Sequence, residues 1–144
     1  MTTTPVRREV VVPVGAERAF ALFTDEIGAW WPIGDVYSVF GTGATVSFRD
    51  GALIEVAPDG REAVWGEVLD WQPPHRLRIT WHPGRDAAVA TEVVVSFVER
   101  HGQTTVVLEH SGWERLANPD ARASYDTGWI FVLGRFESHG RSSR

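Results

Sequence analysis

The sequence of 144 residues contains no cysteine. Disulfide bonds, thiolate nucleophiles and cysteine-based zinc sites are therefore excluded. The chain also lacks any apolar run near the roughly 20 residues that a membrane-spanning helix needs, so we expect no membrane insertion. Residues 1–8 have no apolar segment of the kind found in secretory signals, which makes a cytoplasmic protein the expectation.

Positive charge is scarce. Lysine and arginine number 14 against 19 aspartate and glutamate residues, for a net charge of −5. Proteins that bind nucleic acid usually present a basic patch, and the only local excess here is the tail with Arg141 and Arg144. We therefore expect no nucleic-acid partner.

Motifs for metals and cofactors are lacking as well. The five histidines, at 75, 82, 101, 110 and 139, show neither an i, i+4 pair nor an H-x-H spacing. Gly41-Thr42-Gly43 lacks the third glycine of a dinucleotide site, and no serine lies in a nucleophile elbow. The sequence thus predicts no metal and no cofactor.

What is present fits one ordinary globular domain over residues 1–144, with tails at 1–4 and 140–144 that we expect to be disordered. Apolar residues make up 43% of the chain and charged residues 23%. Seven tryptophans are the unusual feature. Aromatic rings fill cores and line ligand pockets equally well, so both interpretations stay open.

The hydrophobic pattern changes period along the chain. It predicts a strand at 7–12, helices at 15–25 and 27–31, and a final long helix at 118–138 with Asn118 as cap, Pro119 at its first position and Gly140 as terminator. Between the helices, alternating apolar residues and turn residues predict six further strands. Those strands are 44–49, 52–57, 62–71, 75–82, 90–100 and 103–111.

This order favours an α+β fold in which a curved antiparallel sheet of six or seven strands wraps around the C-terminal helix. Strand parity places Ile79 and Trp81, Val95 and Phe97, and His110 on the face toward that helix. We expect Trp81 and Phe97 to face Tyr125 and Trp129. Because a twisted sheet curls away from a straight helix, either side chains or a ligand must fill the space between them.

Several local motifs in this order resemble one superfamily. The matching segments are 14–25, Trp30-Trp31-Pro32, Gly66-Glu67-Val68-Leu69, 73–77, Thr80-Trp81, 105–113, and Gly128-Trp129 with Leu133. In these segments the chain is similar to the START/SRPBCC (pollen-allergen-like) proteins, and within them to bacterial homologues of the activator of heat-shock protein ATPase (the AHSA group). One departure is Val14-Gly15, where many relatives have proline.

The resemblance implies a helix-grip fold with a cavity for a hydrophobic small molecule. It does not fix a reaction, because such folds host carriers, sensors, cyclases and chaperone regulators. We expect the ligand to contact residues of the sheet face, of the helix and of the segment after the second short helix. These residues are Trp31, Trp65, Ile79, Trp81, Val95, Phe97, His110, Tyr125, Trp129 and Val132.

His110 is the candidate catalytic residue, since an inward histidine could orient or deprotonate a ligand. The alternative is a core histidine hydrogen-bonded to Tyr125 or to a backbone carbonyl. Glu67 would face inward on the parity of Trp65, and the alternative is that this parity is wrong. Trp31 and its neighbour Trp30 could form a lid over the ligand or a packed plug.

Three functions remain open at this point. The first is a carrier or sensor that binds an apolar or aromatic molecule, and the second is a cyclase or isomerase that uses the same cavity. The third, which the family resemblance suggests, is regulation of a chaperone ATPase as part of a stress response. A single acidic domain with no charged interface argues against a chaperone partner, and a homodimer stays open.

Overall fold

The computed structural model describes residues 4–34, 36–118 and 120–143. In this part of the chain, seven strands form one antiparallel sheet in the order β1-β7-β6-β5-β4-β3-β2. The predicted meander is confirmed, because strands β2 to β6 each pair with the next one in sequence. The strands are β1 (Val6–Val12), β2 (Thr45–Arg49), β3 (Ala52–Val56), β4 (Glu62–Gln72), β5 (Arg76–Trp81), β6 (Thr91–Arg100) and β7 (Gln103–Ser111).

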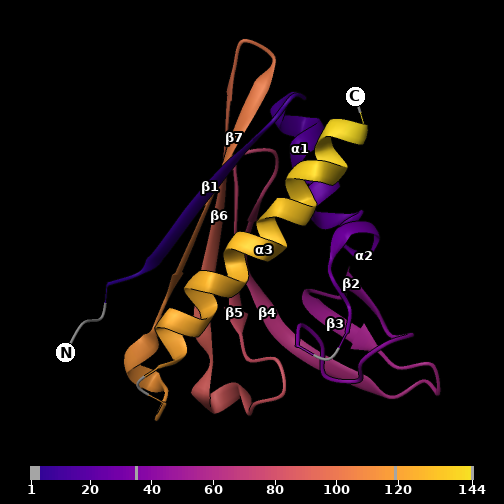
Figure 1. The fold of residues 1–144 in the computed structure, drawn as a ribbon, viewed down its shortest axis with the longest axis vertical. Helices are drawn as coiled ribbons and strands as arrows, with labels where there is room; N and C mark the ends of the chain where they lie inside the picture. Colours follow the sequence, from indigo (N-terminus) through magenta and orange to yellow (C-terminus); the bar gives the residue numbers. More distant parts are fainter. Residues whose placement is uncertain (1–3, 35, 119, 144) are drawn as a thin grey trace.

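The helices all cover one face of the curled sheet. α1 (Ala16–Thr24) and α2 (Ile27–Trp30) follow β1, and the long α3 (Ala121–Ser142) crosses the sheet diagonally with its C-terminal end beside α1 (Figure 1). α1 buries Ala19, Phe20, Leu22 and Phe23, which are the apolar residues that predicted it. The fold is therefore the expected α+β helix grip. Two short 3₁₀ segments, Ala87–Val89 and Trp113–Arg115, were not predicted.

The boundaries of α3 differ from the prediction at both ends. The helix begins at Ala121 with Asp120 as its N-cap, while the Asn118 side chain accepts a hydrogen bond from the Asp120 N–H. Pro119 lies outside the described residues. Gly140 does not end the helix, which runs on to Ser142, so residues 140–142 are not part of a tail. Gly140 is retained inside the helix because it packs against Val12, where a larger residue would collide.

The predicted alternation of inward and outward side chains holds in β5 and β7 and fails in β4, whose pairing is irregular. Leu77, Ile79 and Trp81 of β5 are buried, as predicted, and so is His110 of β7. In β4 the pairing register shifts on both sides, and Trp65 and Gly66 are buried next to each other. The alternation therefore breaks after Trp65.

This irregularity decides where Glu67 points. Glu67 is exposed on the outer face of the sheet, where it accepts hydrogen bonds from Thr80 Oγ1 at 2.7 Å and contacts His82 Nε2 at 2.9 Å. The parity that placed it inward is wrong. Gly66 is required at this point, because a Cβ there would lie 1.7 Å from the Thr80 carbonyl oxygen.

Candidate functional site

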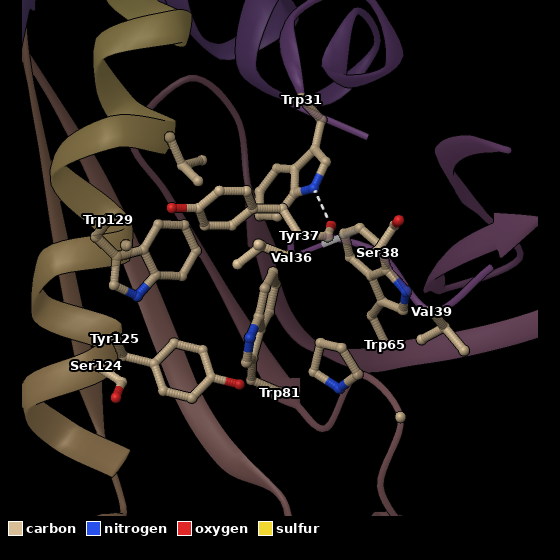
Figure 2. A pocket seen from close by; sticks show the side chains of 14 residues that line it. Trp31, Val36, Tyr37, Ser38, Val39, Trp65, Trp81, Ser124, Tyr125 and Trp129 are labelled. Carbon is tan, nitrogen blue, oxygen red and sulfur yellow. Dashed lines mark hydrogen bonds between the residues drawn. The ribbon is translucent and has the colours of Figure 1, made fainter. Parts of the chain in front are cut away.

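A cavity of about 470 Å³ lies between the sheet and the N-terminal half of α3 (Figure 2). We call it the α3 cavity. Its walls come from the segment after α2, from β4 and β5, from the turn after β5 and from α3. The lining residues are Trp31, Val36, Tyr37, Ser38, Val39, Trp65, Trp81, Pro83, Gly84, Ser124, Tyr125, Gly128, Trp129 and Val132.

Four tryptophans form the inner part of this cavity. Trp31 lies 5.0 Å from Trp65, 5.9 Å from Trp81 and 6.0 Å from Trp129 between ring centroids, and Trp81 lies 5.4 Å from Trp129. These separations are those of favourable tilted and edge-to-face aromatic pairs. The four rings are buried and packed on one another, so the fold fixes their positions. They come from α3, two strands and a loop, which only the fold brings together.

The wall formed by residues 36–40 is fixed by a buried carboxyl group. Glu55 of β3 is 0% exposed and accepts hydrogen bonds from the backbone N–H of Val39 at 2.7 Å and of Phe40 at 2.9 Å. It also accepts one from Trp65 Nε1 at 3.0 Å. Trp31 Nε1 adds a bond to the Tyr37 carbonyl at 2.7 Å, drawn in Figure 2. The loop is therefore tied to both the sheet and the cavity floor.

The sequence analysis missed Glu55. The available signal was an acidic residue inside the short apolar strand Ala52–Val56, between Ile54 and Val56. A charged residue in such a run is costly to bury unless hydrogen-bond donors surround it. Its donors come from a loop whose path the sequence did not reveal.

His110 lies in the core and does not line the α3 cavity. Trp129 Nε1 donates to His110 Nδ1 at 3.0 Å, so the ring proton resides on Nε2, which lies 2.6 Å from Thr91 Oγ1. The Thr91 hydroxyl in turn donates to the Trp81 carbonyl at 3.1 Å. Both ring nitrogens are thus occupied, and this chain of bonds joins α3 to three neighbouring strands.

The electrostatics agree with a neutral His110. Burial lowers the pKa of His110 to about 3, and the positive charge of Arg85 contributes in the same direction. A core histidine was the alternative interpretation of the sequence, although its partners are Trp129 and Thr91 rather than Tyr125 or a backbone carbonyl. Tyr125 contacts the ring instead, with centroids 4.7 Å apart.

The residues expected to bind ligand divide into two groups. Trp31, Trp65, Trp81, Tyr125, Trp129 and Val132 line the α3 cavity. Ile79, Val95, Phe97 and His110 do not; Ile79 and Val95 belong to the closed core beneath it. The expectation that Phe97 faces α3 is wrong, because its ring packs on Phe20 and Phe23 of α1 at 5.1 and 5.9 Å.

Other polar clusters lie outside this site. The pKa of Glu67 is lowered, mainly by its hydrogen bond to His82, and that of Glu26 is lowered mainly by His139. Within the described residues, no group of three or more His, Asp or Glu side chains has metal-binding geometry. No helix there is both long and apolar enough to cross a membrane.

Comparison with known protein families shows which family the chain belongs to. A family model described as "Activator of Hsp90 ATPase homolog 1-like protein" matches residues 13–139. The chain belongs to this family. The family assignment agrees with the START/SRPBCC resemblance, and no curated protein matches the chain.

Solved structures show the same fold in other members of this structural class. An anthrahydroquino-γ-pyrone synthase, Txn09, complexed with SUM, is 31% identical, with a TM-score of 0.61 over 96% of this chain and 99% of that one. The self-sacrificing resistance protein CalC from Micromonospora echinospora is 22% identical, with a TM-score of 0.66 over 99% of both chains. The Aha1 dimer from Colwellia psychrerythraea is 17% identical, with a TM-score of 0.62, covering 96% of this chain and 95% of that one.

Proposed function

We propose that this protein binds a flat, apolar aromatic molecule in the α3 cavity, as a carrier or sensor. The observation that supports this most directly is the cavity itself. Its volume of about 470 Å³ falls in the range of small-molecule sites, and four indole rings form its inner walls. Burying about 200 Å² of ligand at about 25 cal/mol per Å² supplies about 5 kcal/mol before the costs of association.

Gly128 offers a way to test where the ligand binds. It lines the cavity from α3, and a Cβ at this position would lie 3.4 Å from Tyr37 Cε1. The next glycine on the same helix, Gly134, is exposed, and a Cβ there would meet no atom within 4 Å. Leucine at 128 therefore fills the cavity mouth, whereas leucine at 134 extends into solvent.

The experiment is a titration of the purified protein with polycyclic aromatics, apolar metabolites and fatty acids, followed by tryptophan fluorescence. We expect saturable quenching by at least one aromatic compound. Gly128→Leu should weaken that binding at least tenfold, and Gly134→Leu should leave it unchanged. A flat response across the panel, or equal affinities in the two variants, would contradict a ligand site in the α3 cavity.

A ring-closing enzyme is the second candidate, because the relative that is 31% identical over nearly the whole of both chains is a γ-pyrone synthase. In this case the cavity would hold a substrate folded for cyclisation. His110 is not available as its acid or base, since both nitrogens are bonded within the core. Tyr125, which the sequence analysis gave only as a ligand contact, lines the cavity and carries a hydroxyl group that would take this role.

An ortho-hydroxyaryl β-diketone tests this second function, since it closes to a γ-pyrone when the phenol oxygen bonds to the distal carbonyl carbon and water leaves. Acceleration by the wild-type protein that Gly128→Leu abolishes and Gly134→Leu keeps would support a cyclase. If the rate with protein equals the rate without it while the ligand still binds, the carrier or sensor role stands alone.

The remaining proposals concern partners and location. The family description names activation of an Hsp90 ATPase, and the Aha1 structure is that of a dimer. Stoichiometric capture of purified chaperone would support regulation of its ATPase, and light scattering would give the mass of the assembly. Cytoplasmic residence stays a prediction from the sequence.

A further inference from the structure

The indole N–H groups around the α3 cavity differ in whether they have a hydrogen-bond acceptor. Three of the four cavity tryptophans donate to protein acceptors at 2.7 to 3.0 Å. The fourth, Trp81, is 4% exposed, and its Nε1 has no hydrogen-bond partner among the described residues. The satisfied pairs are Trp31 with the Tyr37 carbonyl, Trp65 with Glu55, and Trp129 with His110.

A buried donor without an acceptor is unfavourable, and nearly all buried polar groups in folded proteins avoid this state. In Figure 2 the nitrogen of Trp81 lies on the edge of the ring that faces Tyr125 and Trp129. Both of those residues line the cavity. The missing acceptor would therefore come from the cavity side.

The neighbouring groups are also donors. Among the described residues, the Tyr125 hydroxyl takes part in one hydrogen bond, a long 3.5 Å contact that it accepts from Arg85 Nη2, so its own proton remains to be donated. Arg85 is held by the carbonyls of Trp81 at 3.0 Å and Val89 at 3.1 Å. Among the described residues no carboxyl group forms an ion pair with Arg85. Its positive charge is therefore not neutralised by a carboxylate and favours an electron-rich ligand atom near Tyr125.

We propose that Trp81 and Tyr125, backed by Arg85, form a donor site that selects a ligand with a carbonyl oxygen, such as an aromatic ketone or quinone. This inference rests on the proposed ligand-binding function and narrows the chemical class of the ligand. Because Trp81 Nε1 is itself buried, the ligand oxygen reaches it when the half-buried Tyr125 ring turns aside, which gives up the ring contacts with His110 and Trp113 as well as the long contact to Arg85. The rest of the cavity binds the rings through apolar contact.

The test compares 9-fluorenone with fluorene, which have the same three fused rings and differ by one carbonyl oxygen. Binding of each is measured by equilibrium dialysis with chromatographic quantification. One hydrogen bond to an otherwise unpaired buried donor should make fluorenone bind about tenfold more tightly. Trp81→Phe should bring the ratio of the two affinities close to one.

Trp31→Phe is the matched control. It removes an equally large indole from the same cavity, but one whose N–H already donates to Tyr37, so the ratio should persist even if both affinities fall. Tyr125→Phe, on the half-buried face of α3, provides a second variant if Trp81→Phe folds poorly by circular dichroism. It should lower the ratio several-fold.

Each outcome bears on the inference in a defined way. Equal binding of fluorene and fluorenone by the wild type would overturn the donor site and leave the proposed binding function intact. A preference that survives in both Trp81→Phe and Tyr125→Phe would overturn it as well. If neither compound nor any other aromatic binds, both the inference and the proposed function fail.

Discussion

The two halves of α3 meet the rest of the molecule differently. Toward the C-terminus, Phe136 packs on Phe23 and Trp30 at 5.2 and 5.1 Å, and Gly140 lies directly against Val12. Toward the N-terminus, Tyr125 and Gly128 face the α3 cavity instead. We call these the closed half and the open half of the grip.

The difference follows from which elements fill the space under the helix. α1 and α2 occupy the closed half with large apolar side chains. In the open half the filler is the loop after Trp31, which is held at the side by Glu55 and so forms a wall rather than a plug. A fold in which one continuous sheet holds one long helix can thus be well packed at one end and hollow at the other.

The largest expected effect is on the wall of the open half, which Glu55 holds in place. Glu55→Ala leaves the N–H groups of Val39, Phe40 and Trp65 without their shared acceptor, so we expect unfolding free energy to fall by about 3–5 kcal/mol. Denaturant unfolding measures this loss, and limited proteolysis should cut first within residues 36–40. Glu9→Ala, at an exposed pair with Arg7, should change stability by less than about 0.5 kcal/mol. A loss of less than about 1 kcal/mol for Glu55→Ala would mean that Glu55 does not hold the wall.

A second prediction concerns His110, which joins α3 to the sheet where the two halves meet. Its pKa of about 3 lies below the ordinary value of 6.5, so the unfolded chain binds a proton more readily than the folded one. Stability should therefore fall as pH drops from about 6.5 toward 3, by up to about 1.4 kcal/mol per pH unit.

His110→Gln supplies the comparison for this pH dependence. Glutamine can accept from Trp129 and donate to Thr91 without titrating. Denaturant unfolding between pH 5 and 6.5, above the range in which Glu26 and Glu67 titrate, should show a flatter slope in the variant. Identical slopes in the two proteins would contradict a neutral, buried His110.

The smallest effect tests the closed half directly. A Cβ on Gly140 would lie 2.6 Å from Val12 Cγ1, so Gly140→Ala should cost about 1–3 kcal/mol through overpacking, less about 1 kcal/mol of gained helix propensity. Gly134→Ala gains helix propensity without a new steric contact, so it should stabilise the protein by about 1 kcal/mol. Thermal unfolding measures both. A stabilising Gly140→Ala would show that the closed half is looser than the structure indicates.

Much of the fold could be predicted from the sequence because it is encoded locally. The alternation of Leu77, Ile79 and Trp81 and the turn pairs Asp50-Gly51 and His101-Gly102 marked strands and hairpins to within one or two residues. In those hairpins both turn residues have positive φ, as the residue types predict. Local signals failed at β4, where register shifts reversed the face of Glu67, and at Gly140, which resembles a helix terminator but serves as a packing contact.

The sequence by itself determined that one sheet of antiparallel strands would hold a C-terminal helix. It gave Trp31, Trp65, Trp81, Tyr125, Trp129 and Val132 as expected ligand contacts, together with Ile79, Val95, Phe97 and His110. Periodicity reports which face of an element is apolar, so it identifies residues that turn inward. Only the tertiary structure decided that the first six of these residues surround a cavity while Phe97 and His110 do not. The reason is physical: whether inward side chains fill a space depends on the distance between elements, and here the Glu55 anchor and the packing of α1 set that distance.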